Sequence, residues 1–412
     1  MKSRTGVSAN DGVQKIIFLI LLLFSLHFWG IFLIPQKVNA ENLIVWLVCG
    51  FSLFIVYKKD GLQFKNAILL FIFGLLINII PAIINLGQSP YRSILGYAFY
   101  YFILFYFLLH YFNLNIKFLE NTIIIFAIIF SIIFIIQTFI YPYRIVDMNA
   151  YVGRGTIRIR FIGRGFLILA YFLMLNRYLI NFKLINILLP IGFFTILLME
   201  GYRTLIAGTL LVSMIMFFRI VRFDIKYIAI FFVIILLFVG LFQLEMPSRI
   251  LDEFIKTTES NFAEGDNYVR LVQLEFFFKR YPENFSYFIF GGGLPAGDTI
   301  NNFNPELIGQ NYNIVWVDLG LLGFYIVVGA VAVAGILWFT IKSIFIRLPK
   351  DKIYLNLYFL YLLIVSFTTE EIYRPGMFSV HAIGLYLIDK IVEKQSKPEQ
   401  KTAIVETSSG SG

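Results

Sequence analysis

The sequence predicts an all-α polytopic membrane protein with about twelve transmembrane helices. Three observations support this fold class. The chain of 412 residues is 59% hydrophobic and only 14% charged, which is roughly half the charge of a soluble domain. Long apolar runs recur along the whole chain and are separated by polar connections. Lysines concentrate in every second connection, which the positive-inside rule assigns to the cytoplasm.

Each predicted span is an apolar run of the length that crosses a bilayer, about 20 residues. The run at 311–341 is long enough to tilt or to begin outside the bilayer, and the run at 42–57 is short. The predicted spans are 14–35, 42–57, 66–86, 94–112, 119–140, 161–180, 184–200, 203–219, 226–243, 311–341, 352–368 and 376–392.

The lysine-rich connections fix the predicted orientation. They contain the stretches MKSR, YKKDGLQFK, NLNIK, NRYLINFK, FRIVRFDIK, IKSIFIRLPKDK and DKIVEK, so we expect both termini in the cytoplasm. Residues 1–395 then form one transmembrane domain. It includes a large external loop at 244–310, between spans nine and ten, in which we expect short amphipathic helices. Residues 396–412 are expected to be a disordered tail, whose SSGSG end is typical of a flexible end or an engineered linker.

Composition narrows the classes of ligand. Lys and Arg number 34 against 25 Asp and Glu, but in a membrane protein this excess reflects cytoplasmic loops and does not indicate nucleic acid. The single cysteine, Cys49, excludes an intrachain disulfide and a cysteine metal site. No cluster of His, Asp and Glu has metal-ligand spacing, so we predict no metal and no cofactor.

The predicted external face is rich in arginine, where the insertion rule would leave few basic residues. The planar guanidinium suits bidentate binding of phosphate or carboxylate, so we expect one or more anion sites. The alternatives are arginines that reach lipid headgroups or pair with external carboxylates such as Glu200. The candidate anion-binding arginines are Arg158, Arg160, Arg164, Arg203, Arg270 and Arg374.

For two of these arginine-containing stretches, the sequence spacing predicts which side chains lie close together. In RGTIRIRFIGRG, Arg160 and Arg164 are four residues apart and would share one face of a helix. Such converging arginines would clamp a pyrophosphate, and the alternative is a loop that binds anionic lipid. In EGYRTLIAG, Glu200 and Arg203 are three apart and would pair, which would leave Arg203 a satisfied charge.

The large loop contains EGDNYVRLVQLEFFFKRYPE, which has the pattern of an amphipathic helix. Asp266 is a candidate N-cap and Pro282 lies beyond the end. The alternative role is a helix lying on the bilayer surface. The predicted apolar stripe is Leu271, Leu274, Phe277 and Phe278.

Three glycines at 291–293 follow this helix. They predict a tight loop near a ligand or another backbone, or else a flexible turn. Next, NPELIGQNYNIVWVDLGLLG begins a span, and Asp318 would lie about two turns inside it. An ionisable group at that depth is a functional candidate, with pairing to an arginine as the alternative. TTEEIYRPG adds carboxylates at the same side, so the candidate catalytic residues are Asp318, Glu370 and Glu371.

Three stretches in this order resemble the O-antigen polymerase and O-antigen ligase superfamily: GYRTLIAG, DNYVRLVQLEFFFKRYPENFSYFIFGGG and GQNYNIVWVDLGLLGF. The resemblance covers about residues 200–330. It implies a membrane glycosyltransferase of the C-type (GT-C) architecture in the bacterial cytoplasmic membrane, with its active site facing the periplasm or exterior. Its substrates would be oligosaccharides linked to undecaprenyl pyrophosphate, with membrane lipids and a chain-length regulator protein as further partners. Arg203 and Arg270 would hold the donor pyrophosphate.

One departure separates the members of this superfamily. Ligases carry a histidine before the asparagine, whereas this chain has Gln310, which cannot act as a base. The resemblance therefore favours a polymerase that joins repeat units into O-antigen or capsular polysaccharide. The alternatives are a ligase acting on lipid A core, a flippase or other transporter, and a peptidoglycan polymerase of the shape-and-division type. The candidate glycan-binding residues are Gln310, Asn311, Tyr312 and Asn313.

Overall fold

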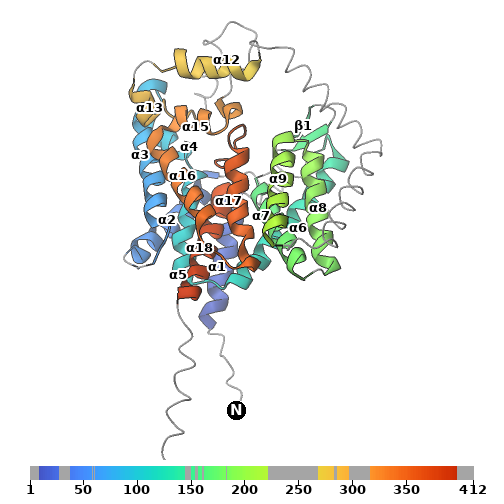
Figure 1. Ribbon diagram of the computed structural model, residues 1–412. Helices are drawn as coiled ribbons and strands as arrows, with labels where there is room; N and C mark the ends of the chain where they lie inside the picture. Colours follow the sequence, from blue (N-terminus) through green and yellow to red (C-terminus); the bar gives the residue numbers. More distant parts are fainter. Residues whose placement is uncertain are drawn as a thin grey trace, which may run out of the picture.

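The computed structural model is a bundle of helices with one short β-hairpin (Figure 1). Three of the described helices are long and apolar enough to cross a membrane, and four if a bent pair counts as one span. The predicted helical class, with helices of membrane-spanning length and apolarity, is therefore confirmed, while the number of spans and the orientation stay predictions. The structure describes residues 9–26, 38–57, 59, 61–143, 150–153, 156–159, 162–181, 183–220, 268–282, 285–296 and 316–396.

The first part of the chain forms helices on one side of the molecule (Figure 1). The predicted run at 94–112 is a bent pair of helices that meet at 58°. The elements are α1 (Ala9–Ser25), α2 (Val38–Val56), α3 (Lys65–Leu86), α4 (Pro90–Gly96), the 3-10 segment η2 (Tyr100–Leu104) and α5 (Phe105–Phe112).

The next part lies together on the other side, green in Figure 1. Helices α6, α8 and α9 coincide closely with the predicted runs at 119–140, 184–200 and 203–219, whereas the predicted run at 226–243 lies outside the described residues. The elements are α6 (Ile116–Ile140), β1 (Ala150–Gly153), β2 (Thr156–Ile159), α7 (Arg164–Asn181), α8 (Leu184–Glu200) and α9 (Arg203–Ile220).

The last part returns to the first side, and its helices α17 and α18 pack against α7. The end of α18 and the beginning of α1 lie at the bottom of Figure 1, and α12 lies at the top. The elements are α12 (Val269–Glu275), the π turn η4 (Phe276–Arg280), α13 (Ser286–Phe290), η5 (Trp316–Leu319), α15 (Leu321–Val328), α16 (Ala330–Phe345), η6 (Lys350–Lys352), α17 (Tyr354–Val365) and α18 (Met377–Ser396).

The run predicted as one span at 311–341 is broken at Gly329. This residue has φ 88° and ψ 169° and separates α15 from α16. The carbonyls of Ile326 and Val327 at the break accept hydrogen bonds from the N–H groups of Gly292 (2.9 Å) and Gly293 (3.0 Å). The triple-glycine loop thus approaches another backbone, which is one of the alternatives predicted for it.

Side chains from α3 complete this junction. The Asn78 amide donates to the carbonyls of Phe290 and Val327, the latter at 2.9 Å. Asn85 donates to the Gly292 carbonyl at 3.1 Å. Buried backbone groups outside regular secondary structure need hydrogen-bond partners, and the side chains of α3 provide them for this loop.

An ion cluster ties the helices together at the end of the bundle opposite α12. Glu120 of α6 is buried and contacts Arg177 of α7 at 2.8 Å and Lys352 of η6 at 2.6 Å. The Tyr354 hydroxyl donates to the same carboxylate at 2.9 Å. The buried Glu120 carboxylate is therefore paired with two cations and accepts a hydrogen bond from one hydroxyl.

Candidate functional site

The turn between α17 and α18, residues 366–376, is held in shape by its own hydrogen bonds. The Ser366 hydroxyl accepts from the N–H of Ile372 at 3.0 Å, and Thr369 donates to the Val365 carbonyl at 2.8 Å. Gly376 has φ 84° and lies against the backbone of Ile162, where a Cβ would overlap it. We call these residues the 366–376 turn; they bring Glu370, Glu371 and Arg374 to the start of α7.

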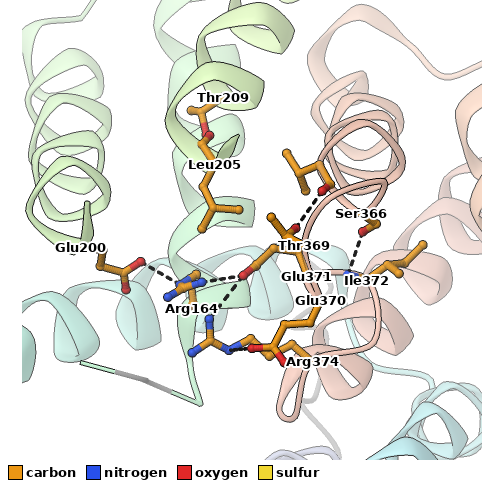
Figure 2. A network of polar contacts seen from close by, with 11 residues as sticks. Arg164, Glu200, Leu205, Thr209, Ser366, Thr369, Glu370, Glu371, Ile372 and Arg374 are labelled. Carbon is orange, nitrogen blue, oxygen red and sulfur yellow. Dashed lines mark hydrogen bonds and ion pairs between the residues drawn. The ribbon is translucent and has the colours of Figure 1, made fainter. Parts of the chain in front are cut away.

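Arg164 is the centre of a buried ion network (Figure 2). Its Nε lies 2.7 Å from Oε2 of Glu200, and its Nη1 lies 2.5 Å from Oε1 of Glu371. Arg374 Nη1 contacts the same Glu371 oxygen at 3.3 Å. The Arg164 guanidinium also stacks over the Tyr202 ring at 4.4 Å. One arginine thus joins α7, α8, the α8–α9 connection and the 366–376 turn.

The network is enclosed by protein. The side chains of Arg164, Glu200 and Glu371 are each no more than 2% exposed. Burial alone would raise the pKa of the Glu371 carboxyl, but the guanidinium groups of Arg164 and Arg374 hold that pKa below its usual range. Glu371 is therefore an ionised carboxylate that neutralises two arginines.

The helical spacing on which two local predictions about these arginines depend is not present. Glu200 and Arg203 do not share a helix, because Gly201 ends α8 in the left-handed conformation (φ 70°) and α9 begins at Arg203. Arg160 and Arg164 do not share one either, because residues 156–159 form strand β2 and α7 begins only at Arg164. Helix spacing rules do not apply across these boundaries.

The accessible edge of the site lies beside the network. Glu370 is 23% exposed, and its carboxylate is 3.9 Å from Nε of Arg374. Arg203 is half-buried at the first position of α9, next to Tyr202. The hydroxyls of Thr204 and Thr368 are 3.5 Å apart, so the start of α9 borders the 366–376 turn.

Asp318 is exposed, and it does not lie two turns inside an α-helix as predicted. It belongs to the 3-10 segment η5, and Gly320, with φ 56°, separates that segment from α15, which begins at Leu321. Asp318 therefore sits outside the helix, at the same end of the bundle as α12.

Helix α12 packs against this segment. Phe276 and Phe277, which directly follow α12, are buried in a small apolar cluster with Leu319 and Ile326. The predicted helix is present, but it begins at Val269 with Tyr268 as its N-cap residue, and Asp266 lies outside the described residues. The predicted stripe is partly wrong, because Phe277 is buried whereas Leu271 and Leu274 are exposed. Arg270 is half-buried on α12.

Tyr373, which the sequence did not mark as a site residue, connects the two groups. Its hydroxyl donates to the Gly320 carbonyl at 3.0 Å, and its ring stacks on Phe324 with centroids 4.3 Å apart. The Leu321 N–H donates to the Ser366 carbonyl at 2.7 Å. Nothing in the local sequence around this tyrosine predicts that it links the 366–376 turn to α15. The 366–376 turn thus contacts the arginine network on one side. On the other side it contacts the junction between η5 and α15.

Some predicted residues cannot be compared with the structure. Arg158 lies in β2, but its side chain lies outside the described residues, as does Arg160. The predicted glycan-binding residues Gln310, Asn311, Tyr312 and Asn313 also lie outside them. Within the described ranges, no group of three His, Cys, Asp or Glu residues is placed to hold a metal ion.

Comparison of the chain with protein-family models and with curated proteins finds no match. Its function is therefore argued from the site and from the sequence pieces that converge on it.

Proposed function

We propose that the protein is a polysaccharide polymerase of the bacterial cytoplasmic membrane. In this proposal it transfers a growing glycan from undecaprenyl pyrophosphate to the sugar of a new lipid-linked repeat unit. About twelve spans with both termini in the cytoplasm would put the site on the outer face. The products would be O-antigen or capsular polysaccharide.

One observation carries the proposal: sequence pieces on which the family resemblance depends meet at one end of the bundle. The start of α9 borders the 366–376 turn through Thr204 and Thr368. That turn binds Gly320, the residue before α15, through Tyr373. Segment η5, just before Gly320, packs against α12. Pieces far apart in the chain thus meet at one end of the bundle, and the proposal puts the pyrophosphate of a lipid-linked substrate there.

The arginines take different roles in this proposal. Arg203 and Arg270 are half-buried and would bind the donor pyrophosphate with their planar donors. Arg374 is buried, with 7% of its side chain exposed, and contacts both Glu370 and Glu371, so it would position the accessible Glu370. Arg164 is enclosed by carboxylates, so it would act as a positioning residue that holds the others.

The chemistry needs stabilisation of negative charge on the leaving phosphate, which preorganised arginines provide. If the transfer inverts the anomeric centre, a base must take the acceptor proton. Glu370 and Asp318 are accessible and would serve, whereas Glu371 is enclosed. If the transfer retains configuration, the departing phosphate would take that proton and no carboxylate base is required.

Purified protein in proteoliposomes with lipid-linked repeat units tests the proposal. A polymerase gives a ladder of chain lengths. Transfer of glycan to added lipid A core would instead identify a ligase, and translocation without longer chains would identify a flippase.

The arginine roles have their own test. Arg203→Lys and Arg270→Lys keep the charge but lose the bidentate fork, so we expect each to lose about 100-fold in activity. The matched control is Arg219→Lys, which changes an exposed arginine at the other end of α9 and should leave activity unchanged. Near-normal activity of both site variants would refute the pyrophosphate role.

A further inference from the structure

Helix α12 and helix α13 expose large apolar side chains although they lie outside the upright bundle. Leu271 and Leu274 on α12 are 49% and 38% exposed, and Phe285, directly before α13, is 72% exposed. Helix α12 lies crosswise over the end of the bundle, and α13 lies above α3 (Figure 1). We call these residues, with Ile289, the α12–α13 apolar face. Exposed apolar patches of this kind mark interaction surfaces.

The direction of this face follows from its neighbours. Phe278 lies in η4, the π turn that follows α12. Its ring contacts Phe288 of α13 and Tyr325 of α15, with centroids 6.4 Å apart in both cases. The segment after α12 therefore packs toward α13. Within α12 and η4, Gln273, Phe276 and Phe277 are buried, whereas Leu271 and Leu274 remain exposed.

The same side of the molecule carries the exposed stripe of α3. This helix is one of those apolar enough to cross a membrane, and its exposed residues Phe73, Leu76, Ile80 and Ile84 recur at helical spacing. Asn85, one residue beyond Ile84, donates to the Gly292 carbonyl just after α13. Helix α13 and the loop after it therefore lie at the end of a helix apolar enough to cross a membrane.

The loop after α13 has the backbone hydrogen bonds that a position next to lipid would require. Residues 291–294 are buried, and their N–H and C=O groups bond to Asn85, Gln88, Ile326 and Val327. Such sealing is what a low-dielectric surrounding requires of irregular backbone. Two charges follow α12 in η4: Lys279 and Arg280 are 74% and 65% exposed and lie 3.8 and 3.9 Å from Glu275.

We propose that α12 and α13 lie in the lipid–water interface of the membrane, with the α12–α13 apolar face among the acyl chains and Lys279 and Arg280 at the phosphates of the lipid headgroups. The occupant of this surface is the bilayer itself. Amphipathic helices of this design bury their apolar side about 5–10 Å into the headgroup boundary.

A consequence follows that rests on the proposed function. Arg270 lies on the same short helix as Leu271, so an interfacial α12 would hold its guanidinium at the depth of the headgroup phosphates. A pyrophosphate attached to a membrane lipid would then reach Arg270 by lateral diffusion, without leaving the bilayer.

The test is a depth measurement with spin labels in nanodiscs of mixed anionic and zwitterionic lipid, without substrate. Single cysteines would replace Leu271, Leu274, Phe285 and Lys279 in a Cys49→Ala background, since Cys49 is the only cysteine. Ile80→Cys in α3 is the positive control. We expect labels at 271, 274 and 285 to contact oxygen more than a water-soluble nickel chelate, at depths of about 5–10 Å, and the label at 279 to show the reverse.

Equal chelate accessibility at 271, 274, 285 and 279, with lipid accessibility at 80, would overturn the proposal. Three labelled positions on two segments guard against one variant that fails to fold, which size-exclusion chromatography would reveal. Because no substrate is present, the result is independent of enzyme activity. An inactive protein whose labels report lipid would refute the polymerase and leave the interfacial surface standing.

Discussion

Replacing Arg164 with glutamine should destabilise the protein strongly, because it strands a buried charge. Glu371 would keep Arg374 at 3.3 Å. Glu200, however, is 2% exposed and has its close ion pair with Arg164, at 2.7 Å. Removing one partner of a buried ion pair costs about 3–5 kcal/mol, because the other charge stays desolvated. The folding equilibrium should therefore fall roughly 10²- to 10⁴-fold.

A double-mutant cycle separates this mechanism from simple loss of packing. Arg164→Gln with Glu200→Gln removes the stranded carboxylate together with its cation and leaves the Glu371–Arg374 pair in place. The double variant should therefore recover stability relative to Arg164→Gln alone, with an interaction energy of about 1–3 kcal/mol.

Unfolding by sodium dodecyl sulfate titration in mixed micelles measures these free energies. The matched control is Arg177→Gln at the other end of the bundle. Arg177 is 31% exposed, and its partner Glu120 keeps Lys352 at 2.6 Å, so the control should cost about 1 kcal/mol or less. Equal losses for Arg164→Gln and Arg177→Gln, or strict additivity of the cycle, would refute the reasoning.

Three other perturbations test the structure. Gly329→Ala should destabilise by at least about 1–3 kcal/mol, because φ is 88° and a Cβ would overlap the backbone of Phe290; Gly192→Ala, with open space around it, should be neutral or stabilising by about 0.5–1 kcal/mol, and a similar melting temperature for both would contradict this. Because the pKa of Glu371 is lowered on folding, the stability it contributes is fully present above its ordinary pKa of 4.5 and is lost as pH falls through the folded-state pKa. Melting curves at decreasing pH should show that loss, and Glu371→Gln should lessen it; an unchanged pH profile for the variant would argue against it. Asn78→Ala should cost about 1–3 kcal/mol, since it removes the donor to the Phe290 and Val327 carbonyls, and a loss in unfolding titrations below about 0.5 kcal/mol would show that these carbonyls find other donors.

The helical elements could be predicted because hydropathy is a local property. The apolar runs at 66–86 and 203–219 correspond to α3 and α9, and the arginine-rich sequence around Arg164 and Arg374 marked two members of the network. Each of these predictions needed only residues within one segment.

The features that escaped prediction depend on contacts between distant segments or on glycine conformation. The break at Gly329 is matched by the loop at Gly292 and by Asn78 of α3. Glu200 pairs with Arg164 because Gly201 turns the chain between α8 and α9. The strand at 156–159 did carry a local signal, the alternation in TIRI, which the helix spacing of the arginines obscured.

The central claim is that this end of the bundle joins lipid-linked saccharides. The most direct measurement is the length distribution of glycans formed by purified protein in proteoliposomes from undecaprenyl-pyrophosphate-linked repeat units. The account predicts a ladder with the native protein and with Arg219→Lys, and almost no extension with Arg203→Lys. Unextended repeat units with the folded native protein, or an undiminished ladder with Arg203→Lys, would contradict it.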